Sequence, residues 1–365
     1  MTGARFFGFV MIDSVKFIGK LNMKHLHVGD GLIMNGGAEF NEVELSFAKV
    51  QGVIDMNSSI FKGKLIMDGV VSADGLFMNG IVALNEIKMR SARIDDQVSM
   101  VGSEFRRKLD MDNLQVRKSL YLRGKSEFNK VILRAAKVAG QIDMSESIFS
   151  EKLNLESISV GQSILCKLSM FGNKSSFDIF FAKVGGSITL FGAKNLPTID
   201  LAGVQINGEL SLPYSDTDSE TWQDGVELKL TNASVGALNA YEKSWPKKVE
   251  LTGFTYARLG GQTIIGGRMD IGGDGSRWYE DVLGRQEHYS PQPYEQLGAV
   301  LQKEGFDTRA REVLYKGKCR GTDATRFGIT WVFRSFQEWM IGYGYYTRRI
   351  FWWFLGFTMF ELPPN

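Results

Sequence analysis

The chain has 365 residues but only two cysteines, Cys166 and Cys319, which lie far apart in the sequence. This scarcity excludes a disulfide framework and a CxxC zinc knuckle, and it indicates a reducing compartment. The first fifteen residues also lack the basic start, uninterrupted apolar run and small-residue cleavage site of a secretory signal. We therefore do not expect export by that route.

An excess of charge of either sign is also missing. The 43 Lys and Arg residues nearly balance the 41 Asp and Glu residues, so the whole chain has no general attraction for nucleic acid or for a membrane. We expect no nucleic-acid partner. Any electrostatic contact must be local.

Signatures of cofactor and metal chemistry are scarce. No G-x-G-x-x-G lies between a strand and a helix, and the Gly-rich stretch 266–275 has neither the spacing nor the following helix. His25 and His27 have no third ligand nearby in sequence, which favours a surface turn over a metal site. The sequence therefore predicts no catalytic residue, no cofactor and no metal ligand.

Pairs of apolar residues separated by one position recur every eleven residues from Val10 to Cys166. Examples are Ile54/Met56, Val98/Met100 and Ile142/Met144. A third apolar residue usually follows seven positions after the first, and Gly, Asn or Asp is common two positions later. The spacing of 2, 5 and 4 disagrees with a 3.6-residue helical period and predicts a strand, a corner, a short strand and a turn.

A longer period of 44 residues lies on top of the short one. AKVQGVIDM (48–56), ARIDDQVSM (92–100) and AKVAGQIDM (136–144) are 44 residues apart, and AKVGGSITL (182–190) is a related word shifted by two residues. Because eleven residues are too few to close a turn around a core, we assign two modules to each coil of about 22 residues. The predicted fold is a mainly β parallel β-solenoid, right-handed by default, with a small C-terminal α-helical region.

The repeat also predicts which residues face outward. Met56, Met100 and Met144 should point into the core, and Asp55, Ser99 and Asp143 outward. Asp55 and Asp143 are then four coils apart and Asp110 lies on the other face, so these carboxylates do not form a glycosidase pair. Val10 already keeps the register, so we expect either that the chain is a fragment or that a partner covers this end.

Every second coil places an apolar or aromatic residue at an outward position of one face. This partner-binding stripe consists of Ile33, Phe77, Tyr121 and Leu165. A row of such side chains about 9.6 Å apart is a plausible docking surface for a protein or for a second copy of the chain. The alternative is that the solenoid tolerates scattered apolar residues on its outside.

The C-terminal third has a different pattern. After Pro291, Tyr294, Leu297 and Leu301 predict one helix, Gly305 breaks it, and Ala310, Val313 and Leu314 predict a second. We favour a packed cap over a peptide-binding groove for this hairpin. An aromatic, basic and apolar segment follows, whose membrane-proximal residues are Tyr343, Tyr345, Arg348, Arg349, Phe351, Trp352 and Trp353.

The apolar run at 350–360 is too short for a membrane span, which needs about 20 residues. Three interpretations stay open: an interfacial anchor, a span whose remainder is missing, and a helix buried against the solenoid. The density of aromatic residues beside two arginines favours contact with the membrane.

The order of pentapeptide-like repeats, then YEQLGAVLQKEGFDTRAREVL (294–314), then WMIGYGYYTRRIFWW (339–353) resembles the bacterial proteins often labelled membrane-associated oxidoreductases. The resemblance implies a cytoplasmic repeat domain, a helical connector and C-terminal membrane helices. It covers most of the chain in layout. This chain departs from that pattern by ending almost where the first membrane helix would begin.

We therefore expect a β-solenoid repeat domain (1–273), a helical hairpin and amphipathic connector (274–342), and a membrane-proximal tail (343–365). The predicted function is a non-enzymatic scaffold that binds a protein partner or itself and is held at the cytoplasmic face of the inner membrane by its C-terminus. The alternative is an enzyme, either an oxidoreductase or a carbohydrate-active β-helix.

Overall fold

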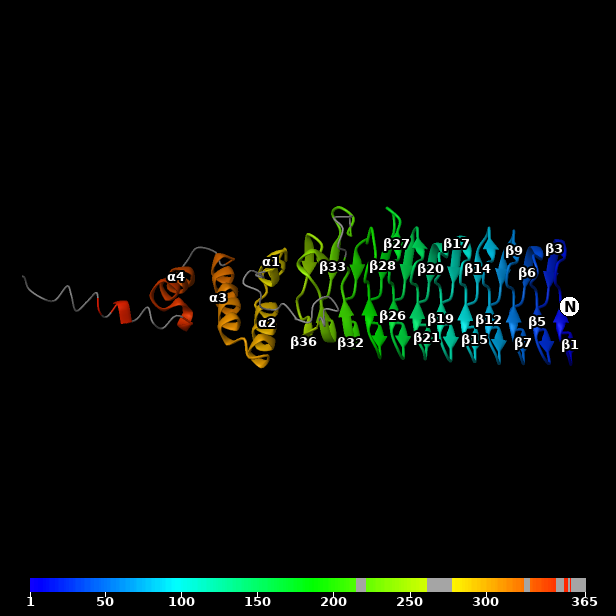
Figure 1. The fold of residues 1–365 in the computed structure, drawn as a ribbon, viewed down its shortest axis with the longest axis horizontal. Coiled ribbons are helices and arrows are strands. Elements are labelled where there is room, and N and C mark those ends of the chain that lie inside the picture. The colour runs from blue at the N-terminus through cyan, green and yellow to red at the C-terminus, as the bar shows by residue number, and fades with distance from the viewer. Residues whose placement is uncertain (215–220, 261–277, 325–328, 346–350, 354, 356–365) are drawn as a thin grey trace, which may run out of the picture.

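The structure is a computed structural model that describes residues 1–214, 221–260, 278–324, 329–345, 351–353 and 355. It is a parallel β-solenoid of about 11 turns with helices at its C-terminal end. Figure 1 shows a straight rod of stacked coils, with the N-terminus at one end and α1 to α4 following one another beyond the other end. The predicted fold class is therefore confirmed.

One long sheet, called sheet A here, runs the length of the rod in two side-by-side columns of two-residue strands. The first column contains β1 (Arg5–Phe6), β4 (His27–Val28), β7 (Lys49–Val50), β11 (Val71–Ser72), β15 (Arg93–Ile94), β18 (Gln115–Val116), β21 (Lys137–Val138), β25 (Ser159–Val160) and β29 (Lys183–Val184). The second contains β2 (Val10–Met11), β5 (Leu32–Ile33), β8 (Ile54–Asp55), β12 (Leu76–Phe77), β16 (Val98–Ser99), β19 (Leu120–Tyr121), β22 (Ile142–Asp143), β26 (Ile164–Leu165) and β30 (Ile188–Thr189). The last strands, β32 (Gln205–Ser211), β34 (Ser234–Asn239) and β36 (Thr255–Gly260), span both columns.

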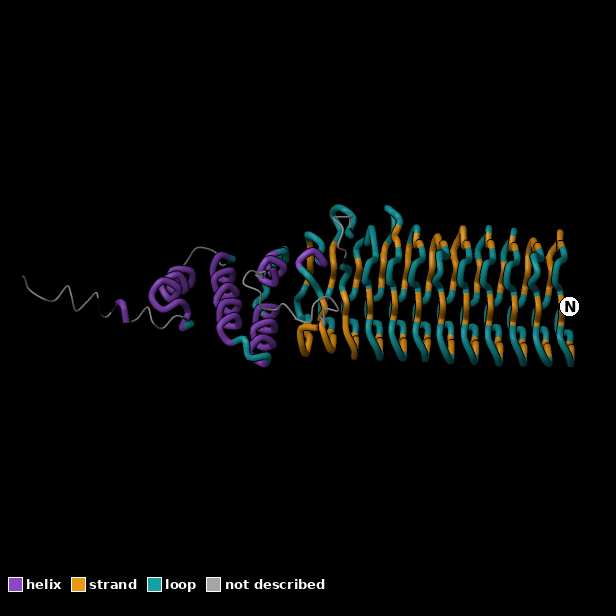
Figure 2. The backbone as a smooth tube through the Cα atoms, viewed as in Figure 1, coloured by secondary structure: helices purple, strands orange, loops and turns teal. Residues whose placement is uncertain are grey.

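A second sheet, sheet B, closes the coils on the other side (Figure 2). Its strands are β3 (Lys16–Asn22), β6 (Glu39–Glu44), β9 (Ile60–Phe61), β10 (Leu65–Ile66), β13 (Val82–Ala83), β14 (Ile87–Lys88), β17 (Glu104–Asp110), β20 (Glu127–Ile132), β23 (Ile148–Phe149), β24 (Lys152–Asn154), β27 (Met170–Phe171), β28 (Ser176–Asp178), β31 (Ile199–Asp200), β33 (Glu227–Lys229) and β35 (Lys248–Glu250). Leu76 pairs with Val98, and Val98 pairs with Leu120. Each step is 22 residues, which confirms two eleven-residue modules per coil.

The core is a set of ladders in which the same position of successive coils stacks. Met56, Met100 and Met144 are fully buried, as the alternation predicted. A second ladder stacks phenylalanine rings, with the centroids of Phe105 and Phe128 5.0 Å apart. A row of buried serines donates hydrogen bonds to backbone carbonyls; the Ser126 hydroxyl, for example, donates to the Met100 carbonyl at 2.8 Å. Stacking therefore buries apolar surface, and it also gives hydrogen-bond partners to polar groups that would otherwise be buried without one.

The corner before the first column of sheet A requires a left-handed backbone in every described coil. Glycine supplies it at Gly69, but Phe47 and Ala135 adopt the same conformation, with φ of 58° and 52°. Such angles are uncommon for residues with a Cβ atom. The hydrogen bonds to the next coil hold them there, as between the Phe47 amide and the Asp68 carbonyl at 2.9 Å.

The predicted helical hairpin is confirmed as α2 (Gln292–Lys303) and α3 (Asp307–Asp323), with Gly305 at φ 86° between them. Tyr294, Leu297, Leu301, Ala310 and Val313 are buried. The other helical elements are η1 (Glu242–Ser244), α1 (Trp278–Gly284), α4 (Ile329–Ile341) and η2 (Gly342–Gly344).

Side-chain amides join the helices to the open edge of the last coil. The Gln292 amide accepts from the Gly253 backbone at 2.9 Å and donates to the Phe254 carbonyl at 2.9 Å. Gln296 donates to the Tyr256 carbonyl, and the Glu304 carboxylate accepts from the Leu259 amide. The hairpin therefore caps a sheet edge whose backbone groups would otherwise be free to pair with another chain.

Candidate interaction surfaces

The stripe residues occupy one ladder of the second column of sheet A. Phe77 pairs with Ser99, Ser99 with Tyr121, and Tyr121 with Asp143, so Ile33, Phe77, Tyr121 and Leu165 stand on alternate rungs as predicted. All four are half-buried. The Phe77 ring lies against the backbone of Gly75, where an added Cβ would be 2.6 Å from it. The role of these residues in binding a partner stays a prediction.

The polar residues between them are more covered than their outward direction suggested. Ser99 and Asp143 are buried, and Asp55 is half-buried. The cause is the neighbouring coil: Arg123 reaches Asp143 at 3.2 Å, and the Asn35 amide donates to the Asp55 carboxylate at 2.9 Å. In a solenoid, a side chain that points away from the core can still be buried by its neighbours along the rod.

The first coil carries the most exposed apolar side chains of the solenoid. Phe7 is 95% exposed and Ile18 82% exposed, and Phe9 and Met11 are exposed beside them. Met11 pairs with Ile33, so this apolar end continues into the stripe. The exposed apolar residues of the first coil are therefore contiguous with Ile33 of the stripe.

The described membrane-proximal residues divide into half-buried and exposed groups. The Tyr343 hydroxyl lies 2.5 Å from the Thr322 hydroxyl and 3.4 Å from the Glu338 carboxylate, so this side chain packs against α3 and α4. Phe351 and Trp352 are exposed, whereas Tyr345 and Trp353 are half-buried, and the Trp353 ring lies 4.2 Å from the Trp339 ring. Arg348 and Arg349 lie outside the described residues.

Helix α4 adds a surface that the sequence analysis did not single out as one face. Val332, Phe333, Phe336 and Trp339 are each more than half exposed. Their spacing puts them on one side of the helix, and Trp339 connects them to the aromatic residues after it through Trp353. The amphipathic spacing of 332, 333, 336 and 339 was a usable signal in the sequence. Within the described parts of the chain, every helix is too short or too polar to cross a membrane.

Neither cysteine is an activated thiol. Burial raises the pKa of Cys166 far above its usual range, and burial together with the nearby Glu338 carboxylate raises the pKa of Cys319 to about 11. Both thiols are therefore protonated near neutral pH and are poor nucleophiles. In the described residues, no three His, Cys, Asp or Glu side chains are grouped so that they could hold a metal ion.

A row of basic side chains was present in the sequence but was not recognised as a surface. Lys49, Arg93, Lys137 and Lys183 are the second residues of the four related segments 48–56, 92–100, 136–144 and 182–190, and all four are exposed. The sequence signal for this surface was a Lys or Arg that recurs between two apolar residues, both of which point into the core.

In comparisons with known proteins, no family model, no curated protein and no solved structure matches this chain.

Proposed function

We propose that this chain is a non-enzymatic scaffold, a β-solenoid that binds a protein partner or a second copy of itself while its C-terminus holds it at the cytoplasmic face of the inner membrane. The observation that carries the proposal is the exposed apolar face of α4, formed by Val332, Phe333, Phe336 and Trp339. A helix with its aromatic side exposed is typical of attachment in the plane of a membrane interface.

Three further features support attachment at this end. Phe351 and Trp352 extend the exposed aromatic surface beyond α4. In the sequence, Arg348 and Arg349 precede them with only Ile350 between, and each arginine near an anionic lipid surface contributes about 1 kcal/mol. The hairpin α2–α3 fixes this surface to the rod, so that a membrane-bound α4 would leave the solenoid free to bind partners.

Vesicle flotation tests the attachment. We expect the full-length protein to float with vesicles of anionic phospholipid and the triple variant F333Q/F336Q/W339Q to stay mainly in the bottom fraction, because the helix then loses the apolar area that it would insert. The variant R348E/R349E should float less than the wild type and should lose its remaining flotation at high salt.

The matched control replaces exposed phenylalanines of the solenoid, in the variant F47Q/F181Q. This control should float as well as the wild type. If F333Q/F336Q/W339Q floats equally well, the face of α4 is not the membrane contact, and the proposed attachment through α4 is rejected.

The stripe gives a separate prediction about the partner. Because Phe77 and Tyr121 are half-buried and outward, F77D/Y121D should lower the melting temperature only slightly but weaken self-association or capture of a partner. Sedimentation velocity over a range of concentrations measures the self-association. Unchanged sedimentation together with unchanged capture by affinity pull-down would remove the stripe from the scaffold's binding surface.

A further inference from the structure

The outward residues of the first column of sheet A alternate between cations and neutral side chains. Pairing places Lys49 beside Val71, Arg93 beside Gln115, Lys137 beside Ser159, and Lys183 beside Gln205. We call Lys49, Arg93, Lys137 and Lys183 the cation column. Since neighbouring parallel strands are about 4.8 Å apart, successive cations stand about 9.6 Å apart along the rod.

The cation column differs from the other charged rows because its members lack acidic partners among the described residues. On the adjacent corner, Arg90 pairs with Asp68 at 2.6 Å, and on sheet B, Lys152 pairs with Asp178 at 2.6 Å. In the described strands from Arg5 to Thr255, no Asp or Glu pairs at the outward position of the first column.

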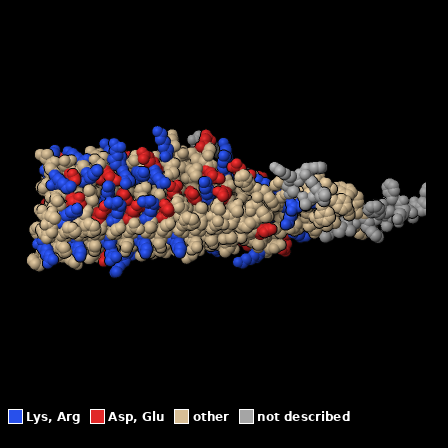
Figure 3. Space-filling model, turned by 180° about the vertical axis from the view of Figure 1, so that it is seen from behind, with Lys and Arg blue, Asp and Glu red and all other residues tan. Residues whose placement is uncertain are grey.

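Figure 3 shows the same contrast over one face of the molecule. Basic and acidic atoms are mixed on the upper part of the solenoid, whereas Lys and Arg atoms recur along its lower edge. In Figure 1, the labelled strands at this edge include β7, β15 and β21 of the first column.

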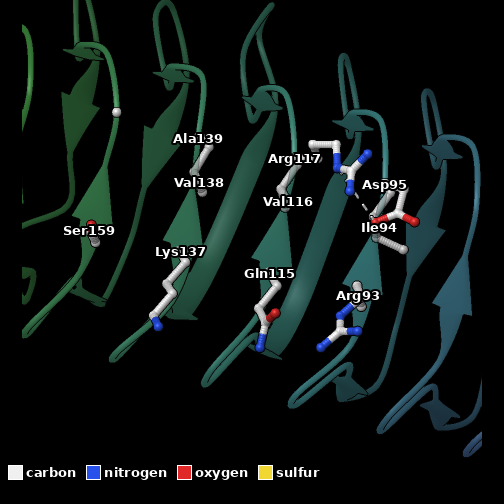
Figure 4. Close-up of a pocket in the computed structure, with 11 residues that line it drawn as sticks. Arg93, Ile94, Asp95, Gln115, Val116, Arg117, Lys137, Val138, Ala139 and Ser159 are labelled. Atoms are coloured by element: carbon white, nitrogen blue, oxygen red, sulfur yellow. Dashed lines mark ion pairs between the residues drawn. The ribbon is translucent and has the colours of Figure 1, made fainter.

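A shallow hollow of about 560 Å³ runs beside the column across four coils, from Arg93 to Gly161. In Figure 4, Arg93, Gln115 and Lys137 lie in a row on successive strands, and Arg117 turns toward Asp95, with which it forms an ion pair at 4.0 Å. Small residues, Ala139 and Gly161, line the hollow where the chain bends. Because these residues are small, the hollow is open at the bend, and the side chains of the cation column lie along one side of it.

A second hollow of about 720 Å³ follows the same bend nearer the helices. Ser187, Asn207 and Gly236 line it, together with the charged residues Glu209, Arg258, Lys303 and Glu304. Gly185 and Gly186 occupy the bend between the two hollows, where an added Cβ would collide with the backbone of the preceding coil. The two hollows therefore follow one line along the solenoid, with small residues between them.

We propose that this line is a binding site for an extended acidic polysaccharide in which one sugar in two carries a carboxylate. The carboxylates would pair with Arg93, Lys137 and Lys183, whose separation along the rod is close to the length of an extended disaccharide. The neutral sugars between them would hydrogen-bond to Gln115, Ser159 and Gln205. The alternation of charge in the column thus matches an alternation of charge in the ligand.

The lining favours a polysaccharide over single-stranded nucleic acid. Nucleic acid carries a phosphate at every unit, and proteins that bind it without regard to sequence stack its bases on aromatic side chains. Among the described residues, no aromatic side chain lines either hollow, and the polar side chains between the cations suit hydroxyl groups.

Affinity electrophoresis and calorimetry with hyaluronate test the proposal, because this polymer carries one carboxylate per two sugars. We expect binding to hyaluronate, and none to hydroxyethyl cellulose, which is neutral. R93Q/K137Q should weaken binding about tenfold or more, and the affinity of the variant should depend less on salt than that of the wild type, because two cations that pair with carboxylates are gone.

The control variant K125Q/K167Q removes two exposed lysines that lie off the column and form no ion pair with a described residue, so it changes the net charge equally. It should bind hyaluronate like the wild type. Absence of hyaluronate binding, equal loss in both variants, or stronger binding of poly(U) than of hyaluronate would overturn the proposal.

Anionic vesicles separate this site from the membrane contact. R93Q/K137Q should float as well as the wild type, and F333Q/F336Q/W339Q should bind hyaluronate as well as the wild type. If R93Q/K137Q loses flotation and hyaluronate binding is absent, the cation column faces lipid and the polysaccharide site is rejected.

Discussion

Replacing Leu120 by Asp should abolish soluble folded protein. Leu120 is fully buried in β19 and pairs on both sides, with Val98 in the preceding coil and Ile142 in the next. A carboxylate at this position has no partner in the apolar ladder, and burying an unpaired charge costs several kcal/mol even after the structure relaxes. That cost is comparable to the whole stability of many domains.

A substitution in the middle of the rod also destabilises the coils on both sides of it. Each coil is held by its two neighbours, so a defect in the middle of the rod breaks the stack into two parts that each expose a new edge. We expect L120D to appear in the insoluble fraction after expression and, if it is refolded, to lack a cooperative thermal transition.

The neighbouring residue supplies the control. Tyr121 lies on the same strand but points outward, where Arg123 lies 5.1 Å above its ring. Y121D introduces the same carboxylate one position away and should remain soluble and melt cooperatively, with a melting temperature lowered only modestly because the new carboxylate lies beside Asp143. Soluble L120D that melts cooperatively would show that the eleven-residue register is wrong.

The register of the solenoid could be predicted because each position repeats in many coils. Met56, Met100 and Met144 share one environment, so a fixed spacing and a two-residue alternation specify their burial together. The hairpin could be predicted for another reason: Gly305 separates two segments with helical spacing, and a left-handed glycine ends a helix readily.

The surface was harder to predict, since exposure depends on the coils above and below. Asp143 was expected outside and is buried because Arg123, twenty positions earlier, folds over it. The cation column was hidden because Lys49, Arg93 and Lys137 are part of the words that revealed the repeat. Only the pairing of β7, β11, β15, β18 and β21 shows that these residues form one row without acidic neighbours in it.

The interactions at the C-terminal end of the solenoid depend on contacts that no local pattern encodes. Gln292 and Gln296 are ordinary helix residues in sequence, yet their amides pair with the backbone of the last coil 38 and 40 positions away. The sequence could suggest a cap from the position of the hairpin but not how it satisfies the sheet edge.

Replacing Gly161 by Val should destabilise the solenoid strongly. A Cβ atom at Gly161 would lie 2.1 Å from the Ala139 carbonyl oxygen of the preceding coil, and the obstacle is backbone that cannot rotate away. Overpacking usually costs about 1–3 kcal/mol, and valine at a backbone contact should reach the upper part of that range. A loss of about 3 kcal/mol corresponds to a fall of about 6–12 °C in the melting temperature for a domain of this size.

The control for this variant is Gly19→Val in β3. An added Cβ at Gly19 meets no atom within 4 Å, and valine suits a strand, so G19V should melt at or slightly above the wild-type temperature. Differential scanning calorimetry compares the two variants. Equal melting temperatures for G161V and G19V would mean that the backbone at Gly161 can move away from the preceding coil at no cost in stability. In that case, close packing of the coils would not be the reason that a glycine lines the hollow beside the cation column.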